Sequence, residues 1–263
     1  MATQTKIRPV TYIKSPPNDQ ETFFPSSNPF NCNNFLHPKL SAGDLINGSF
    51  ENGLTGWQVT NSPISVSSAA DYLGVGIVLP TDGVFSAVLD SGGIGDSAQF
   101  VLPALGFTAN DFVNAYPFSG TIPANWMPGG QIAMLYQSFN VNAGDKLSFD
   151  WNFVGLDAFS VGGGFDFSWW ALKVDGNPFY VSVLGNQLGY SNGLGQFWTS
   201  TEFLIQNSGV ATVYFAASGD VAFGSKLHVD NVRLSISAVP EPNSLILSML
   251  IGPMLIFRRR KSA

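Results

Sequence analysis

The feature that most constrains the fold of this chain is a strict alternation of apolar and polar residues in short segments. In the segment KLSFDWNF, residues 146–153, every second side chain is large and apolar. Alternate side chains of an extended chain point to opposite faces, so this pattern predicts a β-strand with one buried face. The residues on that face are Leu147, Phe149, Trp151 and Phe153.

Similar segments follow at short spacing, each bounded by Gly, Asn or Ser. They span residues 167–185, 197–205, 210–218 and 226–237. In the first of them, Asp175-Gly176-Asn177 predicts a hairpin turn, because Gly and Asn tolerate a positive φ. Only residues 108–116 resemble a helix, with Thr108 as the candidate N-cap. Many short strands joined by turns predict an all-β fold, a jelly-roll β-sandwich.

The last of these segments, LHVDNVRLSIS, alternates in two different phases. Its apolar positions are Leu227 and Val229, then Val232, Leu234 and Ile236. A β-bulge at Asp230-Asn231 would return both halves to the same buried face and would turn the Asp230 carboxylate out of the regular pleat. A simple kink at the edge of a sheet explains the change of phase equally well.

Composition excludes several classes of protein. Of the 263 residues, 45% are hydrophobic and only 11% are charged, and the formal net charge is −6. An acidic chain repels phosphates, so we expect no nucleic-acid partner. Cys32 is the only cysteine, which rules out an internal disulfide and a thiolate metal site.

No catalytic motif is recognisable. A nucleophile elbow, a His-Glu-x-x-His helix and a phosphate-binding loop are all missing from the sequence. Of the two histidines, His37 lies near the N-terminus, and His228 alternates with apolar neighbours and is expected to point to solvent. We therefore expect a non-enzymatic protein. A glycoside hydrolase with an unrecognised pair of carboxylates remains as a third reading, since spacing does not exclude such a pair.

The segment LINGSFENGLTGWQV, residues 45–59, is the most distinctive internal sequence. It combines two Asn-Gly turns with the large aromatic residues Phe50 and Trp57, and it contains Glu51. Together with Asp230-Asn231-Val232 near the end of the last segment, it resembles the two ends of galactose-binding-like jelly rolls, a group that includes several families of carbohydrate-binding modules. The resemblance covers both ends of a domain that spans residues 44–237.

This resemblance implies that the first and last strands lie close together and hold a structural Ca²⁺. Glu51 and Asp230 would be its side-chain ligands, and backbone carbonyls would supply the remaining oxygens that this ion prefers. The alternative is that Glu51 accepts hydrogen bonds from backbone amides of the adjoining loop.

Tryptophan rings are candidate stacking platforms for sugars, and we consider Trp126, Trp170 and Trp198 as possible glycan contacts. Burial in the core is the ordinary alternative for such residues. In the pair Trp169-Trp170, the two rings must point to opposite faces of a strand, so at least one is expected in the core.

The C-terminal segment, residues 238–263, has three parts in a fixed order. An extended, proline-bracketed motif, Val239-Pro240-Glu241-Pro242, precedes a predicted short hydrophobic helix over 244–257. A basic cluster follows, made of Arg258, Arg259, Arg260 and Lys261. The apolar run is shorter than the roughly 20 residues of a full membrane span, and the basic residues behind it would stay on the cytoplasmic side. The alternative is a hydrophobic strand or helix packed on the domain.

This order resembles the PEP-CTERM sorting signal of bacterial exported proteins. The resemblance implies recognition by an exosortase-type membrane processing enzyme, contact with the membrane through the C-terminal helix, and exopolysaccharide as a further partner. Residues 1–43 are expected to form an extended or disordered lead-in, and they contain no recognisable signal peptide. An upstream start codon, another export route or a vestigial tail would each explain this.

The sequence therefore predicts a non-enzymatic, exported or cell-surface β-sandwich protein of the envelope or exopolysaccharide matrix. The alternative is a carbohydrate-binding module that grips a glycan through surface aromatics.

Overall fold

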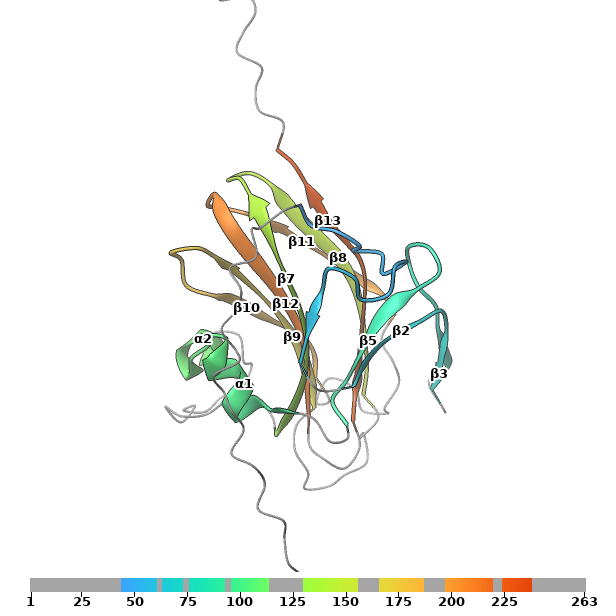
Figure 1. The fold of residues 1–263 in the computed structure, drawn as a ribbon. Coiled ribbons are helices and arrows are strands. Elements are labelled where there is room, and N and C mark those ends of the chain that lie inside the picture. The colour runs from blue at the N-terminus through green and yellow to red at the C-terminus, as the bar shows by residue number, and fades with distance from the viewer. Residues whose placement is uncertain are drawn as a thin grey trace, which may run out of the picture. The chain divides into compact units, whose positions relative to one another are not determined.

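The computed structural model describes residues 44–60, 63–72, 76–92, 96–113, 130–155, 166–186, 197–219 and 224–237. Within these residues two antiparallel sheets pack face to face (Figure 1), so the predicted all-β jelly-roll sandwich is confirmed. The predicted C-terminal helix and the N-terminal lead-in lie outside the described residues.

The first sheet contains the longest strands. Its path runs β1 (Gln58–Val59), β7 (Gln131–Val141), β12 (Gly209–Gly219), β9 (Phe167–Val174) and β10 (Tyr180–Asn186), and β6 (Asp96–Ser97) also pairs with β7. The second sheet runs β11 (Thr199–Leu204), β8 (Lys146–Val154), β13 (Lys226–Ser235), β5 (Ser86–Asp90) and β2 (Ile64–Ser67). A separate hairpin pairs β3 (Ala70–Tyr72) with β4 (Gly76–Val78).

The chain crosses repeatedly from one sheet to the other, as strands β7, β8, β9, β11, β12 and β13 show. Because side chains alternate between the two faces of each strand, every second side chain of both sheets points into the space between them. The main core fills that space, and it includes the predicted inner face of β8, namely Leu147, Phe149, Trp151 and Phe153.

A second apolar layer covers the outer face of the first sheet. Helices α1 (Ala98–Ala104) and α2 (Ala109–Val113) lie against that face (Figure 1). Phe107 and Phe112 pack edge-on against Trp169, with ring centroids 5.5 and 5.1 Å away. Helix α2 begins directly after Thr108, as the sequence predicts, and Asp111 accepts hydrogen bonds from the Thr108 amide and hydroxyl, both at 2.7 Å. Helix α1 was not predicted, because it is short and contains Pro103.

Two further local predictions are confirmed. Asp175, Gly176 and Asn177 form the turn between β9 and β10, with Gly176 at a φ of 77°. The pairing of β13 with β8 shifts register between Asp230 and Arg233, and Asn231 adopts a φ of 53°. The change of phase in the sequence is therefore a β-bulge.

The outer face of β8 differs from the prediction. Asp150 and Asn152, expected on a solvent-facing side, are buried. The reason is that Tyr72 and the segment 81–85 lie over this face of the second sheet, where Tyr72 hydrogen-bonds to His228, and Thr81 and Asp82 hydrogen-bond to Asp230.

Candidate functional site

The first and last segments of the domain lie side by side, as the resemblance implies. The Val232 amide donates to the Gly48 carbonyl at 2.9 Å, at the bulge of β13. Gly48 is required for this approach, because a Cβ there would overlap the Val232 carbonyl. Beside it, Phe50 and Trp57 stack at 5.3 Å in the core, and the Trp57 indole N–H donates to the Asn47 carbonyl at 3.0 Å.

Two carboxylates from these segments hold the same loop, residues 81–85. Glu51 Oε1 accepts from the Val84 and Phe85 amides at 2.7 and 2.9 Å. Asp230 Oδ2 accepts from the Thr81 and Asp82 amides at 2.7 and 2.9 Å, and from the Thr81 hydroxyl at 3.2 Å. Asp230 Oδ1 accepts from the Asn231 amide at 2.7 Å.

This donor set does not fit the calcium ion that the resemblance implies. A Ca²⁺ ion requires several oxygen atoms that point toward it. Here the Glu51 and Asp230 carboxylates accept from backbone N–H groups, whose partial positive charge opposes a cation. Among the described residues, no three Asp, Glu, His or Cys side chains come together as a metal-binding group. Glu51 instead makes the alternative interaction, with backbone amides of the adjoining loop.

Asp150, Asn152, His228 and Asp230 form a buried polar cluster on the outer face of the second sheet, which we call the polar face. The register places His228 directly opposite Asn152, and Asp230 directly opposite Asp150. Asp150 accepts from the Ser200 hydroxyl at 2.5 Å and from the Asn231 side-chain amide at 2.9 Å.

His228 corrects a sequence prediction, because its side chain is fully buried instead of facing solvent. Its Nε2 shares a hydrogen bond of 2.7 Å with the Tyr72 hydroxyl, which reaches it from β3. Burial, helped by the nearby charge of Lys226, lowers the pKa of His228 to about 4, so the ring is neutral at pH 7. Three buried atoms around this cluster have no hydrogen-bond partner in the described part of the chain: His228 Nδ1, Asn152 Oδ1 and Asn231 Oδ1.

The two carboxylates of the polar face differ in their pKa. Burial raises the pKa of Asp230 above its usual value, although the amides of Asp82, Asn231 and Thr81 oppose the shift. Burial acts in the same direction on Asp150, but hydrogen bonds from Ser200 and Asn231 lead the opposing effects, and its pKa is lowered. A hydrolytic pair must reach its substrate, whereas these carboxylates accept from protein donors and Asp230 is fully buried. The arrangement fastens Tyr72 and the loop 81–85 to the second sheet.

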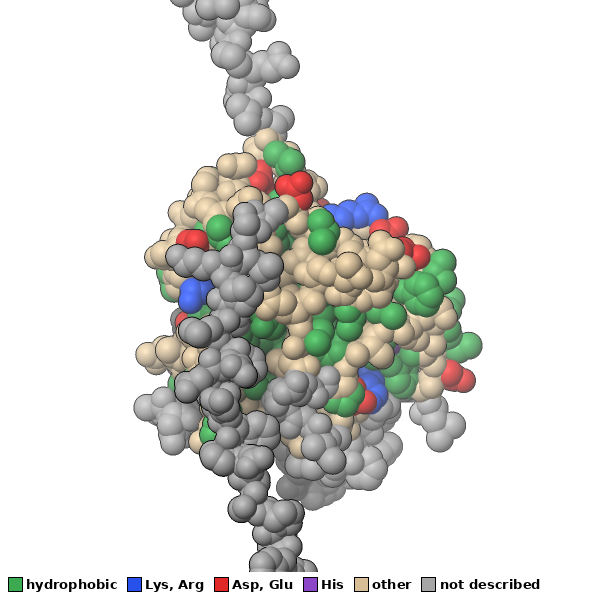
Figure 2. Space-filling model, in the orientation of Figure 1, with side chains coloured by type: hydrophobic (Ala, Val, Ile, Leu, Met, Phe, Trp, Pro, Cys, Tyr) green, Lys and Arg blue, Asp and Glu red, His purple; other side chains and the backbone are tan. Residues whose placement is uncertain are grey.

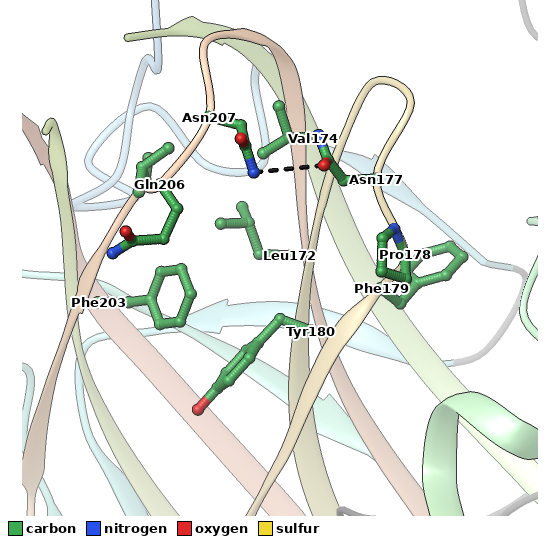
Figure 3. Close-up of a pocket in the computed structure, with 10 residues that line it drawn as sticks. Leu172, Val174, Asn177, Pro178, Phe179, Tyr180, Phe203, Gln206 and Asn207 are labelled. Carbon is green, nitrogen blue, oxygen red and sulfur yellow. Dashed lines mark hydrogen bonds between the residues drawn. The ribbon is translucent and has the colours of Figure 1, made fainter. Parts of the chain in front are cut away.

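A separate groove opens at one edge of the sandwich, between the β9–β10 hairpin and the β11–β12 connection (Figure 3). We call it the edge groove. Its volume is about 320 Å³. Its lining residues are Leu172, Val174, Asn177, Pro178, Phe179, Tyr180, Phe203, Ile205, Gln206 and Asn207.

The Tyr180 and Phe203 rings lie in one part of the edge groove, and the side-chain amides of two asparagines lie in another. Tyr180, which is 43% exposed, packs against Phe203 with ring centroids 4.4 Å apart. Trp170 supports both rings from the core, at 5.2 and 5.5 Å. Asn207 Nδ2 donates to Asn177 Oδ1 at 3.3 Å, and this pair lies away from the Tyr180 and Phe203 rings (Figure 3).

The edge groove was not predicted from the sequence. The segments NPFY (177–180) and FLIQN (203–207) carry its aromatics and amides, but they are 23 or more positions apart along the chain and belong to different sheets. Only the pairing order shows that β10 and β11 are edge strands of facing sheets.

The three tryptophans considered as glycan contacts differ in how the structure bears on that prediction. Trp170 is a core residue with 2% of its surface exposed, so its assignment as a surface contact is wrong. Trp169 is also buried, on the opposite face of the first sheet. Trp198 is half-buried, its indole N–H donates to the Leu79 carbonyl at 2.7 Å, and it does not line the edge groove. Trp126 lies outside the described residues.

The predicted sorting motif, Val239–Pro242, and the basic cluster, Arg258–Lys261, also lie outside the described residues. In the part of the chain that the structure describes, no helix has the length and apolar character needed to cross a bilayer.

No protein-family model and no curated protein matches the chain. Several solved structures are similar to it at low identity. The TmCBM61 module in complex with β-1,4-galactotriose has 13% identity, a TM-score of 0.41, and coverage of 75% of this chain and 100% of that one. The CBM28 module specific for non-crystalline cellulose has 12% identity, a TM-score of 0.38, and coverage of 74% and 97%. The enzymatically active domain of tailspike protein 4 from bacteriophage CBA120 has 9% identity, a TM-score of 0.39, and coverage of 74% and 21%. These values are too low to transfer a ligand or an activity to this chain.

Proposed function

We propose that this β-sandwich is a carbohydrate-binding domain and that the edge groove is its glycan site. The observation that carries the proposal is the combination, in one groove, of the Tyr180 and Phe203 rings with the side-chain amides of Asn177, Gln206 and Asn207. A sugar ring presents C–H groups on its faces and hydroxyl groups at its rim. Aromatic rings pack against the C–H faces of a sugar. Side-chain amides bind its hydroxyl groups, since an amide both donates and accepts hydrogen bonds.

The support beneath the rings favours binding. Tyr180 and Phe203 both pack on the buried Trp170, so their orientation is fixed before a ligand arrives. A preformed groove loses less conformational entropy on binding than one that must be ordered. No Asp, Glu or His lines the edge groove among the described residues, which supports binding without cleavage of the glycan.

Affinity electrophoresis of the full chain in gels that contain soluble polysaccharides tests this proposal. Migration is expected to be retarded by at least one polysaccharide, and Tyr180→Ala is expected to weaken that interaction about tenfold through loss of ring contact. Phe197→Ala is the matched control, because Phe197 is 94% exposed and does not line the groove. Retardation that persists in Tyr180→Ala would place glycan binding elsewhere, and no retardation by any polysaccharide would reject the function.

The C-terminal sequence supports a second proposal, that the protein is exported and sorted by an exosortase-type membrane enzyme. The supporting observation is the order of the Val239–Pro242 motif, the apolar run and the basic cluster Arg258–Lys261. Sorting would place a glycan-binding domain at the cell surface or in the exopolysaccharide matrix. Fractionation of the native bacterium should find the chain outside the cytosol in a shortened form. Replacement of Pro240-Glu241-Pro242 by alanines should abolish the shortening. Wild-type protein confined to the cytosol would reject this proposal.

A further inference from the structure

We infer that the edge groove receives the end of an uncharged glycan chain, and does not receive an acidic glycan or the middle of a chain. This inference rests on the proposed function and deepens it. Two features carry it: the absence of charge from the groove lining, and a pair of asparagines that bridges the two sheets at one end of the groove.

Among the described residues, the groove lining includes no Asp, Glu, Lys or Arg. Proteins bind a uronate or sulfate group most strongly through a cation, because charge-assisted hydrogen bonds replace its water shell. The nearest lysine in sequence, Lys173, does not line the groove, although its Nζ lies 4.3 Å from the centroid of the Phe179 ring, which does. It alternates along β9 with Leu172 and Val174, which do line the groove.

The wider surface also disfavours an anionic ligand. The net charge of the chain is −6, which opposes the approach of a polyanion. Charged side chains are sparse on the face drawn in Figure 2, where most of the surface is uncharged. Asp175, an exposed residue of the turn that carries Asn177, adds a negative charge near the groove.

The asparagine bridge links the β9–β10 turn to the connection between β11 and β12. Asn207 Nδ2 donates to Asn177 Oδ1 at 3.3 Å. Asn177 is itself held in place, because its amide donates to the Val174 carbonyl at 2.9 Å and its Nδ2 donates to the Asp175 carbonyl at 3.2 Å. The turn is joined in addition to β12 by a 2.9 Å hydrogen bond from the Asp175 amide to the Val210 carbonyl.

The bridge lies toward one end of the groove, and the Tyr180 and Phe203 rings lie toward the other (Figure 3). A glycan that rests on the rings meets the bridged side chains and cannot continue past them without breaking the hydrogen bond. The bridge uses one hydrogen of the Asn207 amide, so the second hydrogen and the carbonyl oxygen of that side chain can bind hydroxyl groups of a terminal sugar. The volume of about 320 Å³ is at the small end of ligand pockets, which fits a short terminal segment.

Calorimetric titration of the full chain with two matched sets of glycans tests the inference. The first set contains neutral oligosaccharides of β-1,4-linked glucose, galactose, mannose and xylose, and the second contains oligogalacturonate and oxidised, uronate-bearing forms of the same glucan. At least one neutral glycan is expected to bind about tenfold or more tightly than its acidic counterpart. Equal or tighter binding of the acidic form would overturn the assignment of an uncharged ligand.

The end preference is tested with the best neutral polysaccharide before and after partial depolymerisation. A protein that binds chain ends finds more sites per gram as the chains shorten, in proportion to the number of ends. A protein that binds internal segments finds a constant number of sites per gram. Asn207→Ala should remove the dependence on chain ends because it breaks the bridge. Phe197→Ala, at an exposed position outside the groove lining, should retain it.

These outcomes distinguish the inference from the function on which it rests. A constant number of sites per gram, with binding that Tyr180→Ala still weakens, would overturn the end preference and leave carbohydrate binding intact. Absence of binding to every glycan in both sets would overturn both.

Discussion

At the scale of single residues, His228 is the residue whose surroundings most change its chemistry. It is fully buried against Tyr72 and Trp198, and its pKa falls from an ordinary 6.5 to about 4. The unfolded chain therefore binds a proton between pH 6.5 and pH 4 that the folded chain does not bind. Stability from this residue is complete above pH 6.5 and is lost as the pH falls toward 4.

We predict that the free energy of unfolding decreases by up to about 3 kcal/mol over this pH window on account of His228. Urea denaturation at a series of pH values measures the slope. His228→Gln keeps a polar group for Tyr72 but cannot titrate there, so its slope should be shallower than that of the wild type by this amount. Equal slopes for the two proteins would show that folding does not shift the pKa of His228, and would contradict its burial in a neutral form.

Asp230 is fully buried and accepts hydrogen bonds from the Thr81 amide and hydroxyl and from the Asp82 and Asn231 amides. Asp230→Ala leaves the amides of Thr81, Asp82 and Asn231 without an acceptor. We predict a loss of about 2–4 kcal/mol in the free energy of unfolding, because several hydrogen bonds to one fully buried carboxylate are lost together. Glu202→Ala is the control, since Glu202 pairs with Lys146 at an exposed site and should contribute less than about 1 kcal/mol. Similar losses in both variants would contradict a special role for Asp230.

At the scale of elements, the loop 81–85 depends on a glycine. Gly83 adopts a φ of 72°, and a Cβ at this position would overlap Glu51 Oε1. Gly53 also has a positive φ, of 64°, but a Cβ there meets nothing within 4 Å. Alanine substitution at both positions therefore distinguishes the cost of backbone strain from the cost of steric contact with Glu51.

We predict that Gly83→Ala lowers the free energy of unfolding by about 2–4 kcal/mol, through strain and displacement of Glu51. Gly53→Ala should cost only about 1 kcal/mol, from the strain alone. Thermal and urea denaturation of both variants measures the difference. An equal cost at the two positions would mean that Glu51 moves aside freely and does not hold the loop.

The elements differ in how well sequence alone predicted them. The inner face of β8, the β9–β10 turn and the β13 bulge are determined by residues close together in the sequence. Periodicity and turn chemistry were therefore sufficient to predict them. The outer face of β8 and the position of His228 were predicted wrongly, because they are covered by Tyr72 and the loop 81–85, which are far away in the chain. The edge groove was missed for the same reason: Tyr180 and Phe203 meet only once the strand order is known.

At the scale of the whole molecule, the resemblance to galactose-binding-like domains suggested a metal that the side chains do not accommodate. Glu51 and Asp230 occupy the expected places near the two ends of the domain, but both bind backbone amides of the loop 81–85. The same two carboxylates thus join the ends of the domain through hydrogen bonds, and no ion is needed between them.

We therefore predict that removal of calcium leaves the stability of the domain unchanged. Differential scanning calorimetry in excess EGTA, in excess CaCl₂ and in buffer alone should give the same Tm, because the carboxylates already have partners. Asp230→Ala should lower the Tm equally in all three conditions. A Tm that rises with CaCl₂ and falls with EGTA would contradict the hydrogen-bonded arrangement and restore these residues as metal ligands.

The junction of the opening turn with the final strand also has a mechanical consequence. The bond from Val232 to Gly48 and the shared attachment of Glu51 and Asp230 to one loop lie between residues 44 and 237, the two ends of the described domain. Tension applied to those ends loads this junction together with the pairing of residues 233–235 of β13 with β8. In force spectroscopy, Asp230→Ala should therefore lower the rupture force of the domain, whereas the exposed-site variant Glu202→Ala should leave it nearly unchanged.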